Sequence, residues 1–330
     1  KRAAHEGMVL LKNENILPMK KDISSIGIIG PNGAKAQIIG GGSATLVPYY
    51  ESHPIEAFKS SLNDNTLIRS SKGCHTYRYL PEINKSLTKE NGFLVEYFNV
   101  TEDGNDFISS KVLTGSKFWI FEGFAKDIIG GDEKPDILVK FSCTYTPNIT
   151  GEHNFEIFAI GKSKLLINET EIIDNWTNTS PGDAFFAHGT TSKRGGKVLN
   201  KNKTYKIEIQ YKFEGNFPAI YIGCQPPDKI DLMDEALNIA KEVEQVVLMV
   251  GTNSDWETEG NDRVDFNLPG KQNELIEKVL EINPNTIVVL NTGSPINMPW
   301  IDKAKAVIQS WYAGQEYGNA LVDILTGAAN

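Results

Sequence analysis

The fold of this sequence is constrained most by the order in which two kinds of predicted strand follow one another along the chain. The stretch 245–252 is an apolar run, which is typical of a strand buried on both faces of a parallel sheet, and 286–293 is a second predicted strand of this part. Between residues 137 and 213, apolar and polar residues alternate with a period of two, which is typical of antiparallel strands with one solvated face. Segments with helical spacing at 231–244 and 271–282 flank the apolar strands. The chain therefore begins as α/β, becomes all-β and returns to α/β.

This order predicts α/β plus all-β architecture. We expect a discontinuous α/β/α sandwich with a mostly parallel sheet, formed by residues 1–90 and 226–330 and interrupted by an antiparallel β-sandwich insert at 91–225. Three separate small domains are less favourable, because the two or three strands of the first part would make a poor sheet alone.

Local patterns predict the remaining elements of the α/β part. Apolar spacing predicts a helix over 1–13, and Gly30-Pro31-Asn32-Gly33 predicts a tight strand-to-helix turn. The other expected elements are a strand at 24–30, a helix at 52–62, a weak strand near 66–71, a strand at 305–314 and a helix at 317–327.

Composition excludes several classes of protein. The 330 residues carry a net charge of −9, which argues against a nucleic-acid partner. No apolar run reaches the ~18 residues of a membrane span. The N-terminal "MVLL" is too short for a signal-peptide core, so the sequence leaves a secreted and a cytoplasmic location open. Without an initiator Met, we expect a piece of a longer polypeptide.

No cofactor or metal is expected. The three cysteines, Cys74, Cys143 and Cys224, are far apart and are predicted to be buried small hydrophobes. The five histidines are scattered, so a metal site is not supported. A nucleotide-binding protein is a weaker interpretation, because "GIIGPNGAKA" lacks both the dinucleotide fingerprint and the P-loop lysine.

Asn-x-Ser/Thr sequons gather in or beside the predicted insert. They would suggest a glycosylated, secreted surface, although a segment rich in Asn, Ser and Thr produces such triplets by chance. The candidate glycosylation sites are Asn84, Asn99, Asn148, Asn168, Asn175, Asn178 and Asn202.

The acidic loop "DWETEGNDR" (255–263) is the main candidate for chemistry. It follows the apolar strand 245–252, at the sheet edge where ligands of open α/β folds bind. Clustered carboxylates repel one another, which can keep one of them protonated as a general acid. Trp256 would offer a flat wall to a sugar, and Arg263 would pair with a carboxylate, for which Asp262 is the expected partner. A solvated acidic loop remains the alternative, and this reasoning does not tell which carboxylate acts.

Six blocks of sequence in this order resemble the α/β-sandwich domain of glycoside hydrolase family 3 β-glucosidases. The blocks are "EGMVLLKNENILPM", "IGPNG", "GGGSATLVPYY", "DWETEGNDRVDFNLPGKQNELI", "NPNTIVVLNTGSPINMPW" and "WYAGQEYGNALVDILTG". The insert, from "GFLVEYFN" through "AIGKSKLLINETEIIDNW", resembles the protective-antigen-type β-sandwich that some members of the family carry.

The resemblance implies a retaining β-glucosidase in which Glu259, directly before the loop glycine, is the general acid/base. Trp256, Asp262 and Arg263 would bind substrate or support the loop. The family's nucleophile is an Asp in an "SDW" motif on a preceding (β/α)8 barrel that this chain lacks. Asp255 belongs to a similar triplet but lies in the acid/base loop, so it is not assigned, and the chain alone is expected to be inactive.

The same resemblance suggests the partners. They are a β-glucoside or oligosaccharide substrate, the barrel of the same polypeptide, which "GGGS" (40–43) is expected to contact, and possible further copies in a homo-oligomer. The alternative function is a carbohydrate-binding or adhesion module acting through the β-sandwich. Calcium-dependent sugar binding is not expected, because "AIGKSK" (159–164) lacks the Asp pair of related lectins.

Overall fold

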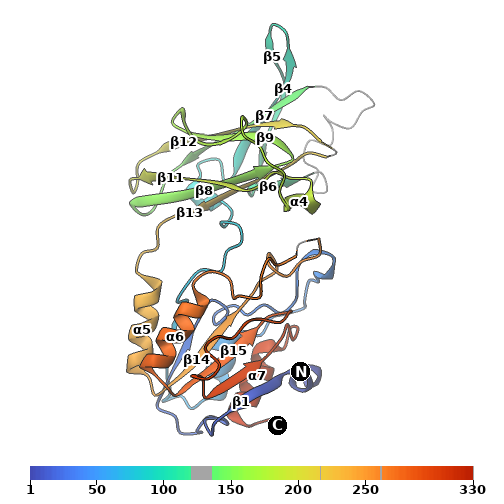
Figure 1. The fold of residues 1–330 in the computed structure, drawn as a ribbon. Helices are drawn as coiled ribbons and strands as arrows, with labels where there is room; N and C mark the ends of the chain where they lie inside the picture. Colours follow the sequence, from blue (N-terminus) through green and yellow to red (C-terminus); the bar gives the residue numbers. More distant parts are fainter. Residues whose placement is uncertain (120–135, 216, 261, 330) are drawn as a thin grey trace. The chain divides into compact units, whose positions relative to one another are not determined.

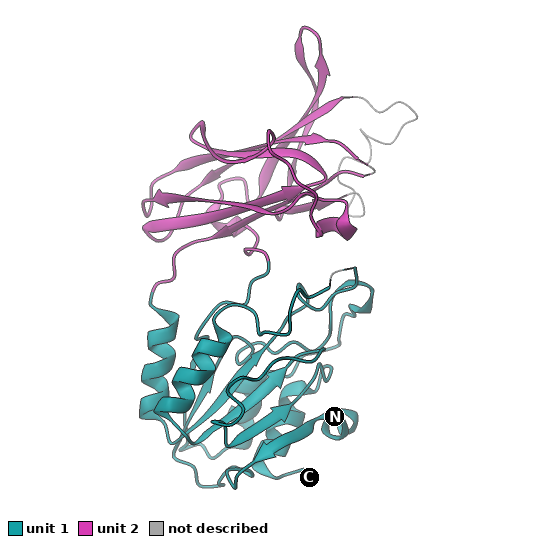
Figure 2. Ribbon diagram, in the orientation of Figure 1, with its two compact units in different colours: residues 1–78, 230–330 teal, residues 79–229 magenta. Residues whose placement is uncertain are grey.

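The computed structural model describes residues 1–119, 136–215, 217–260 and 262–329 and consists of two compact units (Figure 1). The α/β unit combines Lys1–Arg78 with Ile230–Asn330, and the β unit is Tyr79–Lys229 (Figure 2). The predicted arrangement, an α/β fold interrupted by an all-β insert, is therefore present in the structure.

The insert begins earlier than the sequence predicts. Residues 79–90 belong to the β unit because their backbone pairs with it: Glu82 forms a bridge with Gly223, and Thr88 forms one with Tyr145. The buried carboxylate of Glu156 also accepts a hydrogen bond from the amide of Leu80. The residues that make these contacts show no apolar–polar periodicity, so the sequence pattern does not predict that they belong to the β unit.

One six-stranded sheet forms the centre of the α/β unit, with the strand order β1-β16-β15-β14-β2-β3. Every neighbouring pair is parallel except β1 and β16, which are antiparallel. The strands are β1 (Val9–Asn13), β2 (Ser25–Ile29), β3 (Leu67–Ser71), β14 (Gln245–Gly251), β15 (Thr286–Asn291) and β16 (Ala306–Gln309).

Helices cover both faces of this sheet (Figure 1). Side chains of β14 alternate between two cores, so that Leu248 packs on one side and Met249 on the other. Burial on both sides explains why the strand is apolar throughout. Helices α5 (Leu232–Glu242) and α6 (Gln272–Ile282) contribute to the first core, and α2 (Pro54–Ser61) and α7 (Tyr317–Thr326) to the second.

The helix predicted over 1–13 is wrong in its second half. Helix α1 (Arg2–Gly7) ends before Met8, and the chain continues as edge strand β1, which pairs with β16. The apolar residues Val9, Leu10 and Leu11 are half-exposed on this edge. Tertiary pairing therefore decides the conformation of a segment whose spacing also suits a helix.

The turn after β2 is present, but no helix follows it directly. Gly30 has a φ of +113°, and an added Cβ would lie 2.0 Å from the carbonyl oxygen of Met249, so only glycine fits there. The chain then runs through turns to a short 3-10 helix, Gly42–Ala44.

In its described residues, the β unit contains a six-stranded and a four-stranded sheet, both antiparallel, whose side chains form one main core. The period of two appears in the structure as alternating burial along β12, where Ile207, Ile209 and Tyr211 are buried. Its strands are β4 (Phe93–Thr101), β5 (Gly104–Leu113), β6 (Lys117–Trp119), β7 (Ile137–Tyr145), β8 (Gly151–Ala159), β9 (Gly161–Ile167), β10 (Thr170–Asn175), β11 (Lys193–Leu199), β12 (Tyr205–Phe213) and β13 (Ala219–Gln225); the short helix α4 (Ala184–Ala187) lies between β10 and β11.

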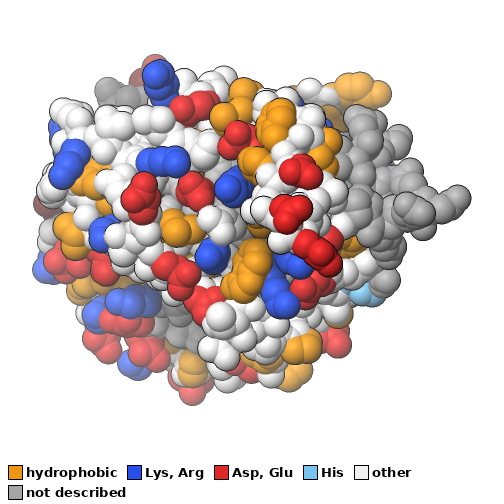
Figure 3. Space-filling model, turned by 90° about the horizontal axis from the view of Figure 1, so that it is seen from above, with side chains coloured by type: hydrophobic (Ala, Val, Ile, Leu, Met, Phe, Trp, Pro, Cys, Tyr) orange, Lys and Arg blue, Asp and Glu red, His pale blue; other side chains and the backbone are white. Residues whose placement is uncertain are grey.

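The cysteines confirm their predicted role as buried small residues, because all three are free and buried. No helix in the described part of the chain is long and apolar enough to cross a membrane. On the face of the molecule drawn in Figure 3, acidic and basic side chains are interspersed rather than gathered into fields of one sign.

Candidate active site

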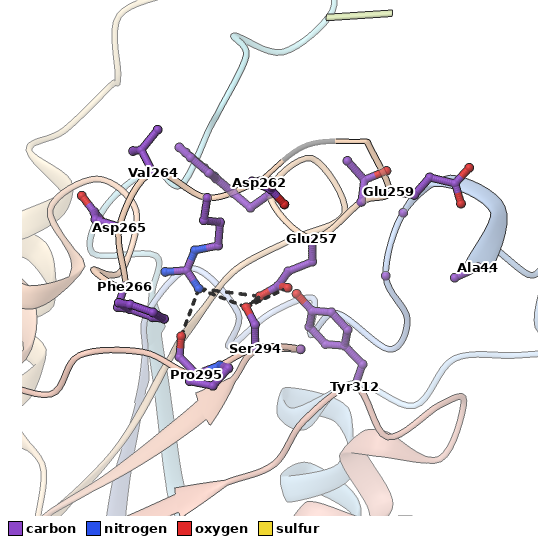
Figure 4. A pocket seen from close by; sticks show the side chains of 16 residues that line it. Ala44, Glu257, Glu259, Asp262, Val264, Asp265, Phe266, Ser294, Pro295 and Tyr312 are labelled. Atoms are coloured by element: carbon purple, nitrogen blue, oxygen red, sulfur yellow. Dashed lines mark hydrogen bonds and ion pairs between the residues drawn. The ribbon is translucent and has the colours of Figure 1, made fainter. Parts of the chain in front are cut away.

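The loops at the carboxyl edge of the parallel sheet form the candidate site. Strands β2, β14, β15 and β16 run parallel, so the segments that follow them meet at one edge. A pocket of about 550 Å³ opens there (Figure 4). Its lining includes Gly41, Trp256, Glu257, Glu259, Arg263, Ser294 and Tyr312.

A buried asparagine at the end of β15 holds these loops together. Asn291 is fully buried, and its amide nitrogen donates to the carbonyl oxygens of Gln37 (2.9 Å) and Trp311 (2.7 Å). Its amide oxygen accepts hydrogen bonds from the backbone nitrogen of Gln37 (2.8 Å) and from the side chain of Asn32 (2.9 Å). One side chain therefore fixes the segments that follow β2 and β16 against the end of β15.

The glycine segment 40–42 lies against the acidic loop. The amide of Gly41 donates to the carbonyl oxygen of Glu257 (2.8 Å), and a Cβ on Gly41 would lie 2.3 Å from the carbonyl oxygen of Ser254. Gly42 has a φ of +67°, and its Cβ would lie 3.0 Å from Cγ of Glu259. Glycine is required because the two backbones approach more closely than a side chain allows.

Glu259 is an exposed residue at the mouth of this pocket. Its carboxylate accepts hydrogen bonds from the hydroxyl of Ser43 (2.6 Å) and from the Ser43 amide (3.2 Å). The following Gly260 has a φ of +75°, which turns the chain directly after the glutamate. Ser43 therefore orients a carboxyl group that remains accessible from the pocket.

Glu257 points in another direction, toward Ser294 and Tyr312 (Figure 4). Its side chain is only 14% exposed, and its carboxylate accepts hydrogen bonds from the hydroxyls of Thr252 (2.9 Å) and Ser294 (2.7 and 2.9 Å). The guanidinium of Arg263 lies 3.9 Å from the same carboxylate. Two glutamates separated by one residue therefore have different environments.

The predicted ion pair between Asp262 and Arg263 is wrong. Arg263 turns inward to Glu257 and donates to the hydroxyl of Ser294 (3.1 Å) and the carbonyl oxygen of Asn267 (2.7 Å), whereas Asp262 is exposed. The inward partners satisfy the guanidinium of Arg263, and an exposed ion pair with Asp262 would contribute little in comparison. Both residues line the pocket.

Tyr312 closes the buried side of the pocket. Its hydroxyl lies 2.7 Å from that of Thr252, and burial raises the pKa of this phenol far above its usual range. A neutral hydroxyl can donate to Thr252 while Thr252 donates to Glu257, which satisfies the whole chain of polar groups.

Trp256 combines packing with lining of the pocket. Its indole nitrogen donates to the carbonyl oxygen of Thr76 (2.7 Å), and the guanidinium of Arg78 lies 5.7 Å from the ring centroid. These contacts fix a half-buried ring whose remaining surface contributes to the pocket. In the described residues, no group of three or more His, Cys, Asp or Glu side chains is arranged to hold a metal ion.

Comparison with known proteins identifies the family. A profile described as "Glycosyl hydrolase family 3 C-terminal domain" matches residues 8–330, which includes both units. The chain belongs to glycosyl hydrolase family 3. This confirms the family predicted from the six sequence blocks and favours a hydrolase over an adhesion module or a nucleotide-binding protein.

The family 3 chain is similar to part of several β-glucosidases. It is 36% identical to a β-glucosidase of Rhizobium radiobacter over 98% of this chain and 39% of that protein. It is 34% identical to probable β-glucosidase I of Emericella nidulans over 100% of this chain and 41% of that protein. A crystal structure of β-glucosidase from Kluyveromyces marxianus in complex with glucose matches with a TM-score of 0.77 and 29% identity, over 99% of this chain and 40% of that one.

The seven sequons of this family 3 chain differ in accessibility. Asn175 is fully buried, and its amide nitrogen donates to the hydroxyls of Ser163 (3.1 Å) and Thr190 (2.8 Å). A glycan on that nitrogen has no room in the folded chain, so the prediction is wrong for Asn175. Asn99 is half-buried, and the exposed candidates are Asn84, Asn148, Asn168, Asn178 and Asn202.

Sequence reasoning missed several residues of the site. The sequence does not predict a role for Thr252, Asn291, Ser294 or Tyr312, although each contacts the acidic loop or frames it. For Ser43, within "GGGS", it predicts a contact with the barrel and not the hydrogen bond to Glu259. A usable signal exists in the chain: polar residues directly after predicted parallel strands meet at one edge of the sheet.

Proposed function

We propose that this chain supplies the general acid/base, Glu259, to a retaining β-glucosidase. The observation that carries the proposal is the position of Glu259, exposed at the mouth of the pocket and held on a loop at the carboxyl edge of the sheet. Such a carboxyl group can protonate the leaving oxygen of a glycoside and later deprotonate the water that releases the sugar.

A second carboxylate is needed as the nucleophile, about 5–5.5 Å from the first in retaining enzymes. Glu257 does not suit this role, because Thr252 and Ser294 donate to its oxygens and Arg263 lies beside it. The chain spans about 40% of the length of the relatives above. We therefore assign the nucleophile to a (β/α)8 barrel elsewhere in the full-length polypeptide.

Exposed apolar side chains near the site support a covering domain. Val47 is 97% exposed and Tyr49 is 99% exposed, in the segment that follows Ser43. Val264, on the other side of the loop, is 99% exposed and lines the pocket together with Phe266. Apolar groups gathered around a pocket in this way mark a contact surface, and the proposed occupant is the barrel.

The proposed substrate is a β-glucoside, with a terminal glucosyl residue bound between the barrel and the edge that carries Glu259. The names of the relatives support glucose as the sugar. The insert predicted at residues 91–225 is proposed to be the protective-antigen-type sandwich of the family, and it lies within the compact β unit Tyr79–Lys229.

The isolated 330 residues provide the first test. Because they supply a proton donor without a nucleophile, they should not hydrolyse an aryl β-glucoside even at high protein concentration. Turnover that disappears in a Glu259→Gln variant would show that this chain contains its own second carboxylate, and the proposed division of labour would be wrong.

The full-length enzyme provides the second test. Glu259→Gln should lower kcat/KM about 10²–10⁴-fold for an alkyl glucoside, whose leaving group needs protonation. It should have much less effect on the first step with a dinitrophenyl glucoside, which needs no proton. Equal activity of the variant and wild type on the alkyl glucoside would contradict the assignment.

A further inference from the structure

We propose that Glu257 is a positioning residue that holds the acidic loop in place so that Glu259 reaches the scissile oxygen. This inference rests on the proposed function of Glu259. It assigns Glu257 no contact with substrate and no proton transfer.

The carboxylate of Glu257 joins the acidic loop to the ends of two strands. Thr252 directly follows β14 and donates to one oxygen at 2.9 Å. Ser294, in the segment after β15, donates at 2.7 and 2.9 Å to the two oxygens. The carboxylate therefore ties the acidic loop to the segments that directly follow two neighbouring strands of the sheet.

The hydrogen-bond directions require an acceptor at Oε1 of Glu257. Ser294 accepts from the guanidinium of Arg263 at 3.1 Å, so its single hydroxyl proton points to Glu257. Tyr312, as the donor to Thr252, likewise leaves the Thr252 proton for Glu257. A glutamine side chain could keep an oxygen there, but it would remove the negative charge beside Arg263 and place an NH₂ group where the second carboxylate oxygen faces Ser294, so it is not equivalent despite its equal size.

The backbone of Glu257 connects the loop to a third segment. Its amide donates to the carbonyl oxygen of Asn253 (2.9 Å), and its carbonyl oxygen accepts from the amide of Gly41 (2.8 Å). Gly41 precedes Ser43, whose hydroxyl binds Glu259. Displacement of Glu257 would therefore disturb both the backbone that carries Glu259 and the serine that orients it.

Glu259 depends on this support because packing does not fix it. It is exposed and lies two residues beyond Glu257, directly before Gly260 with its φ of +75°. A misplacement of about 1 Å can lower the rate of a catalytic step by a hundredfold. The direction of the proton donor thus depends on Glu257, which holds the loop backbone, as well as on Ser43, which binds the carboxylate.

The test uses the Glu257→Gln variant of the full-length enzyme. We expect kcat/KM to fall about tenfold to a hundredfold for an alkyl β-glucoside, which is the range for losing hydrogen bonds to a charged group. For a dinitrophenyl glucoside, kcat/KM should change less than threefold. Its leaving group departs without a proton, so a misplaced general acid at Glu259 has little effect on that step. Glu281→Gln is the matched control, because Glu281 is exposed on α6 and pairs with Lys303 at 3.3 Å.

A second variant, at the hydrogen-bond partner Ser294, tests the same interaction if Glu257→Gln fails to fold. Ser294→Ala removes the hydroxyl that binds both oxygens of Glu257 and should show the same dependence on the leaving group. The double variant should lose less than the product of the single losses, because both substitutions break one interaction. Equal losses for both substrates, or full activity of Glu257→Gln, would overturn the inference.

External azide separates positioning from proton transfer. Azide replaces water as the nucleophile toward the glycosyl-enzyme when the catalytic base is missing, so it should give β-glucosyl azide with Glu259→Ala and not with Glu257→Ala. Azide product from Glu257→Ala would make Glu257 the acid/base and overturn the inference. If Glu259→Gln left kcat/KM for alkyl glucosides unchanged, the proposed function would be refuted instead. The experiments therefore distinguish failure of the proposed function from failure of the inference about Glu257.

Discussion

The Asn291→Ala substitution should destabilise the α/β unit strongly. The side chain makes four hydrogen bonds while fully buried, two to Gln37 and one each to Asn32 and Trp311. At about 1 kcal/mol net for each bond, with a further cost for buried groups left unpaired, we expect a loss of about 3–5 kcal/mol. That is a large fraction of the stability of a typical domain, about 5–15 kcal/mol.

Hydrogen exchange in urea can measure this loss in each unit separately. A peptide from β14 reports on the α/β unit and a peptide from β12 on the β unit. For a urea dependence of about 2–3 kcal/mol/M, the midpoint of the β14 peptide should fall by about 1–2.5 M, while the β12 peptide keeps its midpoint.

The matched control is Asn238→Ala, which removes an exposed asparagine from α5. It should change stability by less than about 0.5 kcal/mol, because alanine suits a helix and no buried partner is lost. A loss below about 1 kcal/mol for Asn291→Ala, or one equal to that of the control, would refute the account in which this side chain fastens the site loops.

Three other perturbations test individual features. Gly42→Val should lower kcat/KM of the full-length enzyme, because a side chain at φ +67° costs about 1–2 kcal/mol and collides with the acidic loop; unchanged kcat/KM would argue against the close approach. The cysteines should resist a thiol reagent at about pH 8 until the chain unfolds, because burial keeps their thiols protonated. Burial raises the pKa to about 11 for Cys74 and about 12 for Cys224, and it raises the pKa of Cys143 further. Rapid labelling of the folded chain would contradict this expectation. Burial lowers the pKa of His153, so the unfolded chain binds the proton more tightly, and stability of the β unit should decline as pH falls below about 6.5. His153→Phe should reduce that decline. If the urea midpoints of this variant and of the wild type depended on pH in the same way, His153 would not contribute to the decline.

The sequence predicts the architecture well because periodicity follows directly from burial. Strand β14 is buried on both faces and reads as a continuous apolar run, whereas β12 has one solvated face and alternates. Segment 8–13 shows the limit of this reasoning, since "MVLLKN" suits a helix by spacing and becomes an edge strand only through pairing with β16.

The candidate site is less predictable, because its contacts join segments far apart in the sequence. Ser43 and Glu259 are 216 positions apart, and Asn291 and Gln37 are 254 apart. Even within the loop, Arg263 pairs with Glu257 rather than with its neighbour Asp262. Charge and proximity in sequence do not determine such a pair.

The azide experiment on the full-length Glu259→Ala variant tests the central claim most directly. With a dinitrophenyl β-glucoside, the variant should form the glycosyl-enzyme and turn it over slowly, and added azide should accelerate turnover and yield β-glucosyl azide. Absence of that product, together with wild-type hydrolysis of an alkyl glucoside by the same variant, would show that the general acid/base is not Glu259.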